Sequence, residues 1–254
     1  MSLETRPDAI RQMAGLRMKV SLDSADEVLA LERKSRWSGL AAHERGAIKD
    51  LVTRTLLSQS VSAGRVAAQV IAKIGAIEIQ PDANSWPELL PGLFSIVENQ
   101  SLGVAPRAAA LTTLGYLLEE LDVYDESPLE QAEVDRFLTV VHSAMAVGSP
   151  QPVQLAAVKA MLNALPFVAT NFEDSHAQER NSIMAAICAA SQLPCTLDVR
   201  EVSFECITKV AELYYDHLDP YMATLAPLTF AAAAGQEEVR SQYICVMLNG
   251  KERG

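Results

Sequence analysis

Four cysteines and four histidines are the residues of this 254-residue chain best able to bind a metal ion or act as nucleophiles. They are Cys188, Cys195, Cys206, Cys245, His43, His142, His176 and His217. No CxxC pair and no Cys/His cluster with the spacing of a zinc site occurs among them. We therefore interpret the cysteines as reduced thiols in a packed core, which indicates a reducing compartment, the cytosol or the nucleus.

The sequence also lacks the short patterns that are typical of enzymes. It contains no glycine-rich phosphate loop, no HExxH and no GxSxG. "HERGAIKD" places His43 beside Glu44, but no second histidine follows at metal-binding spacing. We predict a protein that is not an enzyme and that needs no cofactor or metal.

The formal net charge of −11 is unevenly distributed along the chain. Residues 1–75 hold twelve Lys and Arg against eight Asp and Glu, whereas the rest holds nine against twenty-four. This balance argues against nucleic-acid binding, which requires a basic stripe, and no apolar run is long enough for membrane insertion. Residues 119–135 carry eight carboxylates and no cation, which indicates either a solvated loop or a contact for a basic partner.

Apolar residues recur along the chain at steps of four, eight and eleven, which places them on one stripe of an α-helix. The stripes begin at Val66, Pro106, Val153, Val199 and Val239. These starts are 40, 47, 46 and 40 residues apart, a period typical of HEAT and armadillo repeats with two helices per unit. Because neither helix can bury its stripe alone, the units must stack on one another.

The repeat predicts an all-α fold, a right-handed α-α superhelix of about eleven helices without strands. We expect a single HEAT-repeat solenoid over residues 1–254. Each unit would consist of an A helix followed by a B helix, and the first unit would be partial. The expected units lie near 7–21, 41–78, 86–121, 129–166, 174–217 and 220–248.

Prolines within two A helices favour HEAT over armadillo units. Ser85 and Glu88 form an S-x-x-E capping box, which predicts that a helix begins at Trp86. Pro91 would then lie inside this helix and kink it, as Pro227 would in the A helix at 220–234. A kinked A helix is typical of a HEAT unit.

Several longer stretches resemble the importin β family of nuclear transport receptors, in order and spacing. They are "AGLRMKVSL", "SRW", "ANSWPELLP" with "LGYLLEELD", "VQLAAVKAMLNALPF" and "LYYDHLDPYM". The resemblance implies that the chain runs from the B helix of the second unit to near the end of the seventh. The first helix would then lack its A partner and expose a stripe of Ile10, Met13, Leu16 and Met18.

The resemblance also implies partners and a cellular location. The GTP form of the small GTPase Ran would bind the concave B-helix surface, where Lys19 matches a basic position of the family. Nucleoporin Phe-Gly repeats would insert between A helices, whereas importin α or basic cargo would be held by later units of a full-length receptor. Such a receptor moves between cytoplasm and nucleus through the nuclear pore. The alternative is a generic HEAT scaffold or adaptor that binds other proteins without Ran.

The Phe-Gly surface can be carried over residue by residue. The expected contacts are Leu138 and His142 on one A helix, Glu179, Ser182 and Ile183 on the next, and Tyr221 and Leu228 on the third. His142 and Ser182 stand where the family has aliphatic and aromatic residues. Since phenylalanine insertion depends on apolar contact, we expect weaker binding there than near Tyr221.

Overall fold

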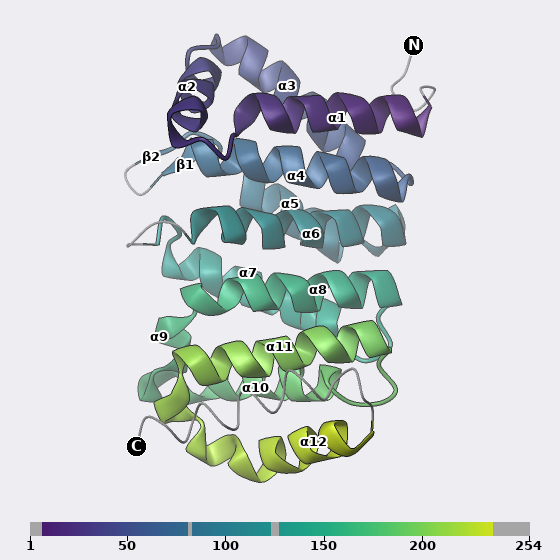
Figure 1. Ribbon diagram of the computed structural model, residues 1–254, viewed down its shortest axis with the longest axis vertical. Helices are drawn as coiled ribbons and strands as arrows, with labels where there is room; N and C mark the ends of the chain where they lie inside the picture. Colours follow the sequence, from purple (N-terminus) through teal and green to yellow (C-terminus); the bar gives the residue numbers. More distant parts are fainter. Residues whose placement is uncertain (1–6, 81–82, 123–126, 236–254) are drawn as a thin grey trace.

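The computed structural model describes residues 7–80, 83–122 and 127–235, and it consists of helices stacked in pairs (Figure 1). One layer, here called the B layer, consists of α1 (Asp8–Leu22), α4 (Val61–Glu78), α6 (Val104–Leu121), α8 (Gln151–Ala164) and α11 (Leu197–Leu213). Each B-layer helix packs on the next one along the stack. The A layer behind it consists of α3 (Ala42–Leu56), α5 (Leu89–Glu98), α7 (Gln131–Met145) and α10 (Ala177–Ala190). The predicted all-α HEAT solenoid is confirmed.

The remaining described elements connect the pairs or lie at the ends of the stack. They are α2 (Glu27–Ser38), α9 (Ala169–Phe172), α12 (Met222–Gly235), strands β1 (Ile79–Gln80) and β2 (Ala83–Asn84), and the 3₁₀ turns η2 (Gln100–Leu102), η3 (Leu165–Phe167), η4 (Asp174–His176), η5 (Tyr215–His217) and η6 (Asp219–Tyr221). The B helix expected near 237–248 lies outside the described residues. The division into repeat units stays a prediction.

No described helix is both long enough and apolar enough to cross a membrane.

The predicted apolar stripes form the core between the two layers. Val66, Val153 and Val199 are buried, and so are the residues four and eight positions after each of them. Cys188, Cys195 and Cys206 are buried free thiols, as predicted, whereas Cys245 lies outside the described residues. Burial raises the pKa of the Cys188 and Cys206 thiols, which keeps them in the unreactive protonated form.

Several elements were not expected from the sequence, and two of them connect consecutive helices near the start of the stack. Helix α2 begins after Asp26, whose side chain accepts a hydrogen bond from the Leu29 amide, and it buries Trp37 near its end. The expectation of no strands was wrong, because Ile79–Gln80 pairs with Ala83–Asn84 as a short antiparallel hairpin. Neither element belongs to the repeating apolar stripe from which the helices were predicted.

The predicted kink at Pro91 is not supported, because the helix starts later than expected. Helix α5 begins at Leu89, and Ser85 provides no cap. Pro91 is therefore in the first turn, where backbone amides have no partner within the helix and the missing N–H of proline costs little. Pro227, in contrast, lies inside α12 as expected.

The exposed stripe expected on the first helix is present, except at one residue. Ile10, Met13 and Leu16 are 51%, 62% and 48% exposed. Met18 was wrongly included, because it packs against the core. It lies three residues from Gly15, which faces α4 so closely that an added Cβ would lie 2.3 Å from Val66 Cγ1.

A buried carboxylate joins three helices near the start of the stack. Glu78, at the end of α4, accepts a 2.9 Å hydrogen bond from the Trp37 indole. Its other contacts are ion pairs with Lys49 at 2.7 Å and Arg45 at 3.2 Å, both on α3. A carboxylate in an apolar core is stable only with such partners, so Glu78 fixes α2 and α3 to α4.

We predict that Glu78→Ala lowers the free energy of unfolding by about 3 kcal/mol, because two partly buried cations lose their anion. Chemical denaturation followed by far-UV circular dichroism measures this change. Glu88→Ala is the matched control, since Glu88 is exposed and its carboxylate forms no ion pair in the described part of the chain. A loss for Glu78→Ala no larger than for Glu88→Ala would contradict the proposed role of Glu78.

Candidate protein-binding surfaces

The first predicted surface, between α7 and α10, is more closed than the sequence suggests. Leu138 and Ile183 are only 8% and 5% exposed, so both belong to the core. His142 is exposed and Ser182 is half-buried, and Nδ1 of the histidine lies 3.1 Å from Oγ of the serine. This hydrogen bond links the two helices across the groove in which an apolar ligand was expected.

The second predicted surface surrounds Tyr221, in the turn directly before α12. The Tyr221 hydroxyl donates a hydrogen bond to Asn181 Oδ1 and accepts one of 3.4 Å from Arg180 Nε, so α10 holds the phenol in place. Tyr221 and Leu228 are half-buried and pack against the core. Glu179, one residue before Arg180, is exposed. Only Tyr221 and Leu228 thus present a partly accessible apolar contact.

Arg180 was not predicted as part of this surface. It is only 7% exposed, and its NH1 donates to the carbonyl oxygen of Phe172 at 2.6 Å. NH1 also lies 3.2 Å from Nδ1 of His217 and forms an ion pair with Asp174 at 3.1 Å. The hydrogen bond to the Tyr221 hydroxyl raises the pKa of the Arg180 guanidinium above its ordinary value. No sequence signal marked Arg180, because it stands among the polar residues "QERNS" at 178–182 and reads as part of a solvated helix face.

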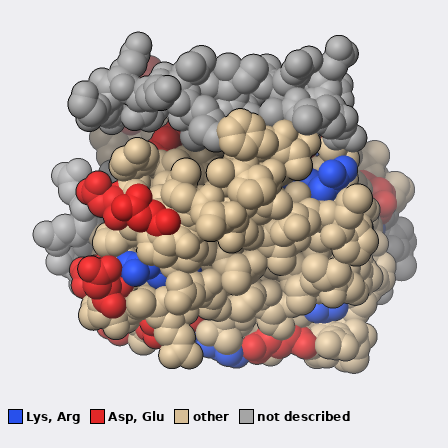
Figure 2. All heavy atoms as spheres, turned by 90° about the horizontal axis from the view of Figure 1, so that it is seen from below, with Lys and Arg blue, Asp and Glu red and all other residues tan. Residues whose placement is uncertain are grey.

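Figure 2, which views the stack from the α12 end, shows a central area without charged side chains and a group of Asp and Glu side chains along one edge. Helix α12 contains no Asp, Glu, Lys or Arg between Met222 and Gly235. Met222 and Phe230 on this helix are 44% and 66% exposed. The apolar contact at Tyr221 therefore continues along α12.

The third predicted position, Lys19, lies on α1 in the B layer. It is half-buried, and its ammonium group has no ion pair among the described residues. It therefore retains a free positive charge on the surface where the family resemblance places Ran.

A second lysine of the B layer, Lys73 on α4, is instead fully paired. Its ammonium lies 2.5 Å from Asp23 and 2.6 Å from Glu120 on α6. Burial alone would lower the pKa of Lys73, but hydrogen bonds to the two carboxylates outweigh it and raise that pKa. Burial alone would raise the pKa of Asp23, and the bond to Lys73 lowers it instead. Glu120 belongs to the acidic segment 119–135, so part of that segment joins units rather than being solvated.

We predict that Lys73→Gln lowers the free energy of unfolding by about 1 kcal/mol between pH 5 and 9. Because the folded pKa of Asp23 lies below its unfolded value, its contribution is lost as pH falls below about 4. The raised pKa of Lys73 places the corresponding loss at high pH, above about 10.4. Urea denaturation across pH measures both losses, with Lys159→Gln as control, since Lys159 is exposed and forms no ion pair in the described part of the chain. A difference from wild type that persists unchanged at pH 3 would disprove the ion pair.

No group of three or more His, Cys, Asp or Glu side chains in the described ranges is arranged to hold a metal ion.

Apart from the exposed Glu179, the residues predicted to contact Phe-Gly repeats fall into three groups. Leu138 and Ile183 are buried, His142 and Ser182 form a polar bridge, and Tyr221 and Leu228 are partly accessible apolar residues.

Comparison with known proteins gives consistent relatives, although no family model matches the sequence. Importin subunit beta-1 of Arabidopsis thaliana is 33% identical over 236 residues, covering 92% of this chain and 26% of the plant protein. The Schizosaccharomyces pombe protein of the same name is 34% identical over 215 residues, covering 84% and 24%.

Solved structures agree with the sequence relatives. A crystal structure of importin β in an ammonium sulfate condition superposes with a TM-score of 0.85 at 27% identity, covering 97% of this chain and 28% of that one. Kap95 in a Kap95:Nup1 complex superposes with a TM-score of 0.77 at 29% sequence identity. That match covers 93% of this chain and 27% of Kap95. The chain spans about a quarter of the length of these relatives. By sequence and by fold, it is a homologue of importin β over a segment of that length.

Proposed function

We propose that this chain works in nuclear transport, as the part of an importin β-like receptor that binds GTP-bound Ran and nucleoporin Phe-Gly repeats. It would carry protein cargo between cytoplasm and nucleus through the nuclear pore. The observation that carries the proposal is the match to importin β in sequence and in fold over nearly the whole chain. The related yeast protein Kap95 has been solved in a complex with Nup1.

Ran would bind the B layer. The free ammonium of Lys19 offers a contact for an acidic side chain of the GTPase. A receptor must prefer one nucleotide form, because only a difference in affinity can couple the nucleotide state to cargo release. For Kap95p, binding is described as inducing the switch loops of RanGDP to adopt the GTP-bound conformation, and this agrees with a preference for that form.

Phe-Gly repeats would bind the A-helix side, mainly at Tyr221 and Leu228. The half-buried phenol and the uncharged α12 offer apolar area there, whereas the His142–Ser182 hydrogen bond occupies the neighbouring groove with polar atoms. Importin α or basic cargo would require further units of a full-length receptor.

A generic HEAT scaffold without Ran binding is the alternative, and the polar His142–Ser182 bridge is the observation that favours it. The two functions differ in nucleotide dependence. A scaffold would bind neither form of Ran or would bind both equally.

We predict that the chain binds GTP-loaded Ran more tightly than GDP-loaded Ran, and that Lys19→Glu weakens the GTP complex about tenfold. The lost attraction and the new repulsion together amount to roughly 1.4 kcal/mol for partly exposed charges. Binding to immobilised Ran at two salt concentrations measures the effect, which should shrink at high salt.

Lys34→Glu is the matched control, because it makes the same charge change at an exposed position of α2. It should leave Ran affinity within about twofold of wild type, as surface changes usually do. Equal affinity of the chain for both nucleotide forms would favour the scaffold.

We predict that Ser182→Phe strengthens binding of a Phe-Gly peptide about fivefold. About 50 Å² of extra apolar contact at roughly 25 cal/mol per Å² corresponds to about 1 kcal/mol. Fluorescence anisotropy of a labelled peptide measures this change, with Ser38→Phe on α2 as control. If both variants gain equally, the added phenyl group acts non-specifically and the α7–α10 groove is not a binding site.

A further inference from the structure

The links that lead from an A-layer helix to the following B-layer helix contain no Asp, Glu, Lys or Arg, although these residues make up 21% of the chain. We call them the A–B links, and the structure describes four: residues 57–60, 99–103, 146–150 and 191–196. They enter the N-terminal ends of successive B-layer helices. The A–B links therefore follow one edge of the stack, on the right in Figure 1.

By sequence, the links that follow the C-terminal ends of the same B-layer helices are acidic instead. Residues 79–88, 122–130, 165–176 and 214–221 each contain at least two carboxylates and no Lys or Arg. The two ends of the B-layer helices thus differ in charge. The edge of A–B links offers no charge to attract a basic or an acidic partner.

Each A–B link exposes an aliphatic side chain, either within the link or at the first residue of the helix that follows. The exposed fractions are 65% for Val61, 38% for Val104, 53% for Val147 and 79% for Leu193. A single exposed aliphatic residue is ordinary on a protein surface. Here one recurs in every unit, on the same edge and without charged residues in the links.

Hydrogen bonds fix neighbouring A–B links to one another. Nε2 of Gln59 in the first link donates to the carbonyl oxygen of Leu102 in the second, at 3.0 Å. Nε2 of Gln154, in the first turn of α8, lies 3.4 Å from the carbonyl oxygen of Ala146 in the third link and 3.4 Å from Sγ of Cys195 in the fourth. The positions of the exposed aliphatic side chains are therefore set before any ligand binds.

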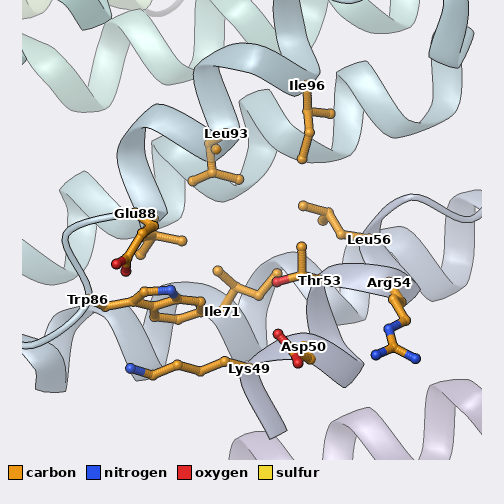
Figure 3. A pocket seen from close by; sticks show the side chains of 12 residues that line it. Lys49, Asp50, Thr53, Arg54, Leu56, Ile71, Trp86, Glu88, Leu93 and Ile96 are labelled. Atoms are coloured by element: carbon orange, nitrogen blue, oxygen red, sulfur yellow. The ribbon is translucent and has the colours of Figure 1, made fainter. Parts of the chain in front are cut away.

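The A-layer surface beside the first two links has a different character. A pocket between α3 and α5 is lined by Leu56, Trp86 and other apolar residues that belong to the core. The exposed side chains around it are the charged Asp50, Arg54 and Glu88 (Figure 3). The combination of accessible aliphatic side chains and no charge is thus a feature of the links and not of this neighbouring surface.

The spacing of the links selects the conformation of a ligand that contacts several of them. Packed helices lie roughly 8–10 Å apart, and this distance separates one link from the next. A polyproline II helix advances about 9.3 Å per turn of three residues, so every third side chain lies on the same face and meets the next link. A β-strand does not fit, because side chains three residues apart point to opposite faces.

We propose that the edge formed by the A–B links binds an uncharged polyproline II segment of a partner protein, with an aliphatic side chain at every third position. These side chains contact Val61, Val104 and the equivalent residues of the next two links, one link each. The exposed amides of Gln100 and Gln192 are placed to donate to backbone carbonyl groups, which a polyproline II helix leaves free.

Each of these contacts is small, so the affinity depends on several of them being made by one segment. A polyproline II segment is already extended in solution, which limits the conformational entropy that it loses on binding. The inference does not depend on Ran or Phe-Gly binding, because none of the residues proposed for those partners lies in an A–B link.

Fluorescence anisotropy of a labelled peptide with four Pro-Pro-Leu repeats tests the proposal. We expect the peptide to bind this chain, because its leucines recur at the spacing of the links. A peptide of the same composition with its four leucines consecutive should bind at least tenfold more weakly. Equal binding of the two peptides, or no binding of either, would overturn the proposal.

The double variant Val147→Asp, Leu193→Asp should weaken binding of the repeat peptide at least tenfold, since it places carboxylates at two of the four contacts. Val20→Asp, Val28→Asp is the matched control, because these valines are 61% and 67% exposed on α1 and α2, outside the links. Circular dichroism verifies that both variants fold. An unchanged affinity of the Val147, Leu193 variant, or an equal loss in the control, would overturn the site.

Light scattering at increasing protein concentration tests a competing occupant of the same edge, a second copy of this chain. Association that Val147→Asp, Leu193→Asp abolishes would assign the edge to contacts between copies and overturn the proposal. A wild-type chain that stays monomeric while it binds the repeat peptide would support it. Ran affinity should be the same in the double variant and in wild type, so failure here leaves the proposed transport function standing.

Discussion

The stack depends on the close approach of neighbouring B helices, which bury along their length the apolar stripe that no single helix can bury alone. Small residues allow this approach. An added Cβ on Gly115 of α6 would lie 3.2 Å from the Cα of Ala160 on α8, so backbone meets backbone there. The residues around this contact, such as Leu114, Val158 and Met161, are fully buried. Each unit is therefore stabilised mainly by its neighbours.

Polar links between units supplement this apolar packing at defined points. Lys73 joins α4 to α6 and to the residue following α1, and Glu78 joins α4 to α2 and α3. These charges lie at the edges of the apolar core, where partners are within reach and water is partly excluded. They fix the rotation of one unit relative to the next. A continuous apolar stripe sets this rotation less specifically.

The A layer differs from the B layer in a way that suits binding. Consecutive A helices contact each other less than consecutive B helices do. The side chains between two A helices then decide the chemistry of the surface there. Between α7 and α10 they are the polar pair His142 and Ser182, whereas between α3 and α5 apolar side chains line a pocket beside Trp86 and Gly92. Neighbouring units of the same solenoid can thus present surfaces of different polarity.

The sequence by itself determined the repeat, the core stripes and the likeness to importin β, because these depend on helical periodicity within one segment. Val66, Val153 and Val199 were predicted and are buried. It could not determine the start of α5, since the turn at residues 85–88 competes with the apparent capping box, and it gave no sign of α2. Only the tertiary structure decided that Leu138 is core, that His142 bonds Ser182 and that Trp86 borders a pocket. Such contacts join residues about forty positions apart, and their distances are set by how one unit packs on the next.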